Sequence, residues 1–157
     1  MPDKRIIVGI ISGILLSFFS VAMFTMWASL IELQDFFGSN IVKIFYILLL
    51  DNFRYDPSFV SGNLYEFFSP QLLAWLLVGF LSGSIAKGRK RGILIAIVIV
   101  IIDLLLWVIV GIVIGEDMFA LFQDMNLVLT IGGIISALIG GSGGGLIGGA
   151  VSGPYQG

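Results

Sequence analysis

The chain is organised as long apolar runs separated by short polar ones. Four runs come close to or exceed the roughly 20 mostly apolar residues that a helix needs to cross a bilayer. They cover residues 6–31, 70–86, 93–115 and 127–151. Pro70 opens the second run, and proline suits the first turn of a helix because its missing N–H is not needed there. The pattern predicts an all-α integral membrane protein, a single domain over 1–157 with four transmembrane helices.

A fifth apolar stretch, "IVKIFYILLL" at 41–50, is shorter. As a helix it reaches about 15 Å, which is half of a bilayer. It contains Lys43 and is followed by the charged sequence "DNFRYDPS". We expect a short helix that lies in the membrane interface or packs against the bundle, with a re-entrant segment as the alternative.

The segment 32–69 around this stretch falls on the external side of the expected topology. It holds ten aromatic residues. Aromatic side chains are favoured at membrane interfaces, which predicts a loop that lies over the bundle and dips into lipid. The alternative is a docking surface for another protein, because exposed aromatic patches mark contacts.

The basic residues predict the orientation. Six of the eight lie either before the first run or between the second and third runs: Lys4, Arg5, Lys87, Arg89, Lys90 and Arg91. Cytoplasmic loops carry an excess of Lys and Arg, so both termini are expected in the cytoplasm of a multi-pass protein of the cell membrane. The turn with Lys87, Arg89, Lys90 and Arg91 is also expected to contact anionic lipid head groups.

The composition agrees with a membrane location and narrows the chemistry. Hydrophobic residues make up 58% of the chain and charged residues 11%, against about a quarter charged in a soluble domain. The net charge of −2 argues against a nucleic-acid partner, which normally requires a basic face. With no Cys, no His and no catalytic motif, we expect no enzyme, no metal site and no cofactor. The external acids Asp51, Asp56 and Glu66 match no calcium loop.

The last run, "IGGIISALIGGSGGGLIGGAVSG" at 131–153, contains ten glycines. Its small residues recur every four positions in two adjacent rows, which form one broad face on a helix. The first row is Gly132, Ser136, Gly140, Gly144 and Gly148, and the second is Gly133, Ala137, Gly141, Gly145 and Gly149. Small residues allow close helix contact in lipid, where no hydrophobic effect drives association. The face is expected to pack on the chain's own helices or on another subunit, or to form a groove for a lipid tail or cofactor.

Asp103 is the one charged residue in the middle of an apolar run, and a carboxylate at that depth costs about 2.5–3.5 kcal/mol. Three interpretations stay open: hydrogen bonds between helices, pairing with a basic residue of another subunit, and a proton or cation path. The candidate partners within the chain are hydroxyls, at Ser12, Ser17, Ser20, Thr25, Ser82, Thr130, Ser136 and Ser142.

The stretch "GFLSGSIAKGRKRGILIAIVI" at 79–99, together with the glycine-rich last run, resembles the small four-span membrane proteins of archaea and some bacteria. The resemblance implies a four-helix membrane bundle and adds no catalytic residues. We therefore expect a non-catalytic structural or accessory subunit that packs through its glycine faces. Its expected partners are the lipid bilayer and other membrane-protein subunits or copies of itself. The alternative function is a small ion or proton channel or transporter unit that uses Asp103.

Overall fold

The computed structural model describes residues 4–24, 41–53 and 69–154, and these residues form helices and turns without a strand. Five α-helices and one short 3-10 helix follow one another in these ranges. They are α1 (Lys4–Phe24), α3 (Ile41–Phe53), α5 (Pro70–Ala86), α6 (Arg89–Ile114), η2 (Met118–Phe122) and α7 (Asp124–Val151). The all-helical expectation is confirmed for this part of the chain.

Local sequence explains where these helices begin and end. At the start of α5 the Ser69 hydroxyl accepts a hydrogen bond from the Leu72 N–H at 3.2 Å, and Pro70 occupies the first turn. At the end of α6, Gly115 adopts a left-handed conformation with φ of 79°, which glycine tolerates without strain. The N–H of Glu116 then bonds to the Gly111 carbonyl at 3.0 Å and closes the helix end.

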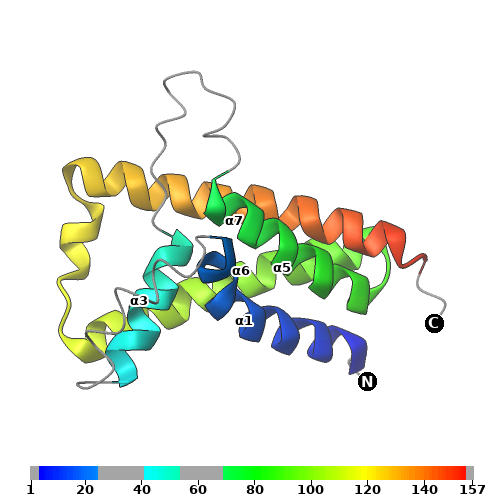
Figure 1. Cartoon of the computed structure of the whole chain (residues 1–157), viewed down its shortest axis with the longest axis horizontal. Helices are drawn as coiled ribbons and strands as arrows, with labels where there is room; N and C mark the ends of the chain where they lie inside the picture. The colour runs from blue at the N-terminus through cyan, green and yellow to red at the C-terminus, as the bar shows by residue number, and fades with distance from the viewer. Residues whose placement is uncertain (1–3, 25–40, 54–68, 155–157) are drawn as a thin grey trace.

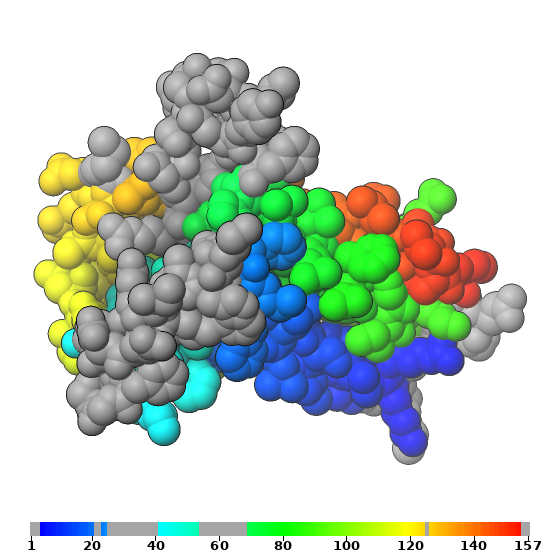
Figure 2. Space-filling view, viewed as in Figure 1, coloured from blue at the N-terminus to red at the C-terminus, as the bar shows by residue number. Residues whose placement is uncertain are grey.

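Long helices α6 and α7 run the full length of the bundle, and shorter helices pack along them (Figure 1). The start of α1 and the end of α7 lie at the same end of the bundle, beside the α5–α6 turn. Figure 2 shows α5 packed between α1 and the end of α7 over this half. We call the end of the bundle that contains the α5–α6 turn the turn end. The opposite end, which contains η2, is the η2 end.

The short stretch at 41–50 is a helix, and it packs against the bundle. Helix α3 packs against α6 and α7 towards the η2 end, and it also contacts α1 and α5 (Figure 1). Its last residues, Asn52 and Phe53, are fully buried. The Phe53 ring lies 5.7 Å from the Trp75 ring and 5.8 Å from the Trp107 ring, centre to centre. Of the segment 32–69, residues 32–40 and 54–68 lie outside the described residues.

Two of the described helices are long and apolar enough to cross a membrane, Arg89–Ile114 and Asn126–Val151. Helix α5 coincides with the expected run 70–86 but has 17 residues, or about 26 Å of helix. Helix α1 ends at Phe24, and the rest of the expected run 6–31 lies outside the described residues. The length and hydropathy of the described helices therefore support two membrane-spanning helices, not the four that the sequence predicts.

Candidate functional site

The two rows of small residues on α7 face the chain's own helices. Among their members, all except the half-buried Gly132 are buried. A Cβ atom added at Gly140, Gly144 or Gly148 would meet backbone carbonyls of α5, those of Leu72, Leu76 and Phe80 in turn. Each step of four residues on α7 thus matches a step of four on α5, so the two helices run parallel in near backbone contact.

The second row faces α6. A Cβ atom at Gly145 would meet the Gly92 carbonyl, and one at Gly149 would meet the Gly88 carbonyl, so α6 runs antiparallel to α7. At the η2 end, a Cβ atom at Gly133 would meet the Phe53 carbonyl at the end of α3. Within the described part of the chain, the rows are therefore occupied by α5, α6 and α3. The large residues of α7, such as Ile139 and Ile147, are exposed on the other side.

Asp103 lies near the middle of α6 and is fully buried, with an exposed fraction of 0%. Neither of its carboxyl oxygens has a hydrogen-bond partner among the described residues. The Ser17 hydroxyl of α1 is a polar neighbour of this carboxyl, but it donates its hydrogen bond to the Ile14 carbonyl at 2.7 Å. Asp103 is therefore a buried acid that the folded helices leave unpaired.

Most other candidate hydroxyls are engaged by backbone. Ser20 donates to the Ser17 carbonyl at 3.0 Å, Ser82 to the Val78 carbonyl at 2.8 Å, and Thr130 to the Leu121 carbonyl at 3.0 Å. Ser136 is buried with no hydrogen-bond partner for its hydroxyl among the described residues. Ser12 and Ser142 are half-buried, and Thr25 lies outside the described residues.

Two further residues with unpaired polar atoms lie towards the η2 end, and the sequence analysis did not select them. The side-chain amide of Asn52 and the indole N–H of Trp107 have no hydrogen-bond partner among the described residues. Trp107 is one helical turn beyond Asp103 on α6, and its ring contacts Phe53, the neighbour of Asn52. The main chain of Asn52 is held in place, because the Trp75 indole donates to its carbonyl at 3.0 Å. We call Ser17, Asn52, Asp103 and Trp107 the polar centre.

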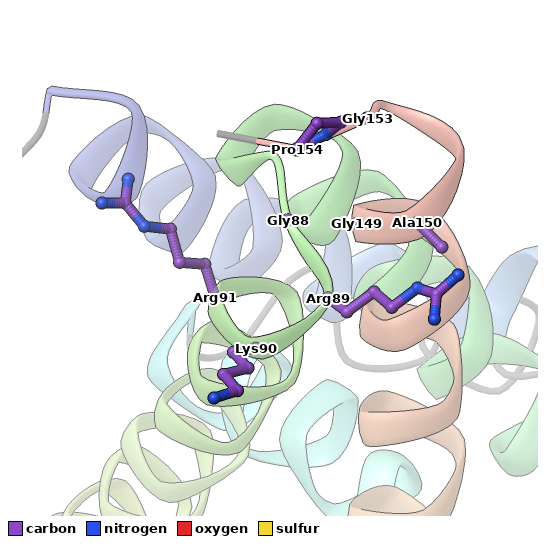
Figure 3. A pocket seen from close by; sticks show the side chains of 8 residues that line it. All are labelled: Gly88, Arg89, Lys90, Arg91, Gly149, Ala150, Gly153 and Pro154. Carbon is purple, nitrogen blue, oxygen red and sulfur yellow. The ribbon is translucent and has the colours of Figure 1, made fainter. Parts of the chain in front are cut away.

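A cavity of about 590 Å³ opens at the turn end (Figure 3). Residues Gly88–Arg91 line one side, and Gly149 and Ala150 of α7 with Gly153 and Pro154 beyond its end line the other. The Gly88 N–H bonds to the Gly149 carbonyl at 3.0 Å and joins the two sides. Arg89, Lys90 and Arg91 line this cavity, whereas Lys87 does not. We call it the basic cavity.

No group of three or more His, Cys, Asp or Glu residues that could hold a metal occurs among the described residues. Asp56 and Glu66 lie outside them, whereas Asp51 is on α3. The chain matches no protein-family profile, no curated protein and no solved structure. The fold defines an all-helical protein with two candidate membrane-spanning helices, and the resemblance to small archaeal-type membrane proteins stays a prediction.

Proposed function

We propose that this chain is a small multi-pass membrane protein that binds a proton or a monovalent cation at Asp103, as a channel or transporter unit. The observation that carries the proposal is the fully buried Asp103 carboxyl, neither of whose oxygens has a hydrogen-bond partner in the described part of the chain. It lies midway along the apolar helix α6, which is long enough to cross a bilayer. An ionisable residue at such a depth is by default a hypothesis for a functional site.

The surface of the bundle suits a lipid solvent. Large apolar side chains are exposed along α1, α6 and α7, including Leu15 at 61%, Leu94 at 62% and Val113 at 72%. Exposed apolar faces of this extent are unfavourable in water and normal in lipid. We take α1, α5, α6 and α7 as the four spans, with the turn end in the cytoplasm, because the basic residues Lys87, Arg89, Lys90 and Arg91 lie there.

An unpaired buried carboxylate requires a compensating positive charge, since the low dielectric of the interior makes an isolated ion costly. The described basic residues lie at helix ends or on α3, and none lies in the middle of α1, α5, α6 or α7. A proton or a bound cation supplies the missing charge. One carboxylate beside the neutral Ser17 hydroxyl balances a single charge, which favours a monovalent ion over a divalent one.

The accessory subunit expected from the sequence packs through its glycine faces into a larger assembly. In the described part of the chain these faces contact α3, α5 and α6 instead. The unpaired polar atoms of the polar centre, in contrast, are not satisfied by other helices in the described part of the chain. The channel or transporter function therefore has the stronger physical basis. Mass measurement of the purified protein in mild detergent tests the accessory function separately.

Ion binding can be measured through tryptophan fluorescence, because Trp107 is one turn from Asp103. We expect Na⁺ or proton titration to change the emission of the wild type, and Asp103→Asn to abolish the change. Asp124→Asn is the matched control, because Asp124 is an exposed acid at the start of α7 whose φ of 47° asparagine tolerates. We expect Na⁺ or proton flux into liposomes that contain the wild type or Asp124→Asn, and no such flux with Asp103→Asn. Equal responses of the wild type and Asp103→Asn, or no response in the wild type, would refute the proposal.

The four-span topology has a clean test because the chain contains no cysteine. Single cysteines introduced as Lys90→Cys at the turn end and Phe119→Cys at the η2 end report their own side of the membrane. In cells we expect an impermeant thiol reagent to label Phe119→Cys only, and Lys90→Cys only after the membrane is opened. Labelling of both positions from outside would contradict the assigned spans.

A further inference from the structure

One side of α6 connects Asp103 with the η2 end. Asp103, Trp107 and Gly111 are all buried and follow one another at four-residue intervals, which places them along the same side of the helix. Helix α6 ends soon afterwards, and the N–H of Glu116 bonds to the Gly111 carbonyl at 3.0 Å. The Glu116 side chain is exposed. This side of the helix therefore leads from a buried carboxyl group to an exposed one.

Tyr46 of α3 covers the outer part of this side and is only 5% exposed. A Cβ atom at Gly111 would lie 3.1 Å from the Cε2 atom of the Tyr46 ring and would also meet the Met118 sulfur, so the glycine leaves room for both side chains. The Tyr46 hydroxyl is a polar neighbour of the Trp107 indole, and the charge of Glu116 acts on it. Tyr46 therefore links Trp107, one turn from Asp103, to the exposed Glu116.

The Tyr46 hydroxyl keeps its proton in this place. Burial raises the pKa of Tyr46 above its ordinary value of 10.0, the negative charge of Glu116 raises it further, and the Trp107 indole lowers it in part. A neutral hydroxyl offers lone pairs to a cation as well as a proton to an acceptor, whereas an indole N–H can only donate. Of Tyr46 and Trp107, only Tyr46 thus has a side-chain oxygen that an entering cation or proton can bind.

We infer that Glu116 and Tyr46 form the outer entrance to the ion site at Asp103. Glu116 attracts cations to the η2 end, because a carboxylate at the surface raises their local concentration. The Tyr46 hydroxyl then gives the entering ion an oxygen on its way to Asp103, since an ion that leaves water without a polar partner meets a high barrier. The inference rests on the proposed function. It assigns Glu116 and Tyr46 to the rate of ion entry, and not to the affinity of Asp103.

The test separates the rate of entry from the affinity. Stopped-flow tryptophan fluorescence of the full chain in mild detergent follows a jump in Na⁺ concentration, balanced with choline chloride, and a jump in pH. Tyr46→Phe keeps the buried ring and removes the hydroxyl, so entry should slow by about tenfold or more, the factor for losing a hydrogen bond to a charged group. Its equilibrium affinity should stay that of the wild type, because the polar neighbour of Asp103 is Ser17 and not Tyr46.

Glu116→Gln removes the surface charge alone. At low ionic strength it should slow entry by about two- to threefold, the effect of one charge about 8 Å away in water. This difference should disappear in about 0.5 M salt, which screens the charge. Asp124→Asn is the matched control, because it removes an exposed acid that is not among the groups acting on Tyr46, and its rate should stay close to that of the wild type.

A structural role of Tyr46 gives a different result. Trp75→Phe removes another buried polar contact of α3 and keeps Tyr46, so it should not slow entry. Wild-type rates in Tyr46→Phe and Glu116→Gln, or equal slowing in Tyr46→Phe and Trp75→Phe, would overturn the inference. In either case, loss of the fluorescence response in Asp103→Asn would still support the ion site. A wild type that responds to neither jump would overturn the proposed function and this inference together.

Discussion

Two adjacent glycines on α7 are expected to respond in opposite ways when each is replaced by alanine. A Cβ atom at Gly143 would have no atom of another described segment within 4 Å, whereas one at Gly144 would lie 2.8 Å from the Phe80 amide nitrogen and 2.9 Å from the Leu76 carbonyl carbon. The obstructing atoms are backbone, so no side-chain rotation can relieve the contact. Helix α5 would have to move away from α7.

The magnitude follows from helix propensity and overpacking. In both variants alanine improves helix propensity by up to about 1 kcal/mol relative to glycine. At Gly143 nothing opposes this gain, so Gly143→Ala should be neutral or stabilising. At Gly144 the forced separation of two packed helices costs about 1–3 kcal/mol, as overpacking does in cores. The cost lies in the upper part of that range, because the obstructing backbone atoms cannot rotate away as a side chain would. We expect the two variants to differ by about 2 kcal/mol.

Unfolding in detergent, followed by tryptophan fluorescence, measures this difference. Trp75 lies on the α5–α7 contact, with its Cβ atom 3.1 Å from the position of a Cβ at Gly140. Equal stability of Gly143→Ala and Gly144→Ala would refute the assignment of the row to α5. If Gly144→Ala instead changed the oligomeric state at unchanged stability, the row would face another subunit, as the accessory-subunit expectation requires.

Three further substitutions test the packing around the polar centre. Trp75→Phe removes the indole N–H that bonds to the Asn52 carbonyl at 3.0 Å and should lower the free energy of unfolding by about 1 kcal/mol in the same assay. Gly133→Ala should displace the end of α3, because its Cβ would meet the Phe53 carbonyl; faster hydrogen exchange of α3 amides would report this. Asp103→Asn should raise thermal stability by roughly 1–2 kcal/mol while abolishing ion binding, since functional groups are often kept at a cost in stability. Unchanged hydrogen exchange in Gly133→Ala would count against its contact with α3. Unchanged stability of Trp75→Phe or of Asp103→Asn would count against the hydrogen bond to Asn52 or against the cost of the buried carboxyl.

Helix positions were largely predictable because apolar runs end at recognisable turn residues. Helix α5 coincides with the predicted run 70–86, and α6 and α7 begin three to four residues before the predicted 93 and 127. The difference at α6 has a physical reason. The sequence analysis assigned Arg89, Lys90 and Arg91 to a polar turn. Long basic side chains can nevertheless belong to a helix, because their charged ends still reach water.

The glycine rows illustrate a second limit of the sequence. A four-residue period identifies a face, but it does not identify what that face contacts. The polar centre was only partly predictable for a similar reason. Asp103 was recognisable in the sequence because it is a charged residue in an apolar run. Trp107 could not be distinguished from the other apolar residues of that run, and Asn52 could not be distinguished from the polar turn that follows it. Only the packing of α3 against α6 and α7 reveals that Asn52 is buried.

The arrangement around Asp103 also predicts the side from which an ion arrives. Towards the turn end, α6 presents the buried apolar residues Ile95, Ala96 and Ile99, and glycines hold the neighbouring backbones together. Towards the η2 end, the unpaired polar atoms of Trp107 and Asn52 follow the carboxyl. A desolvated cation is stabilised by polar atoms and excluded by a close-packed apolar layer. Under the proposed function, we therefore predict that an ion reaches Asp103 from the η2 end, past α3.

This direction can be tested with Asp103→Cys in the chain that otherwise lacks cysteine. A small cationic thiol reagent should modify the cysteine when added on the side that labels Phe119→Cys, and not when added on the side that labels Lys90→Cys. Gly133→Ala, which displaces the end of α3, should accelerate this modification without opening the turn end. Because α3 is the element between the polar centre and the η2 end, modification from the Lys90 side alone would show that α3 seals the bundle and that the apolar layer around Ile99 is the part that opens.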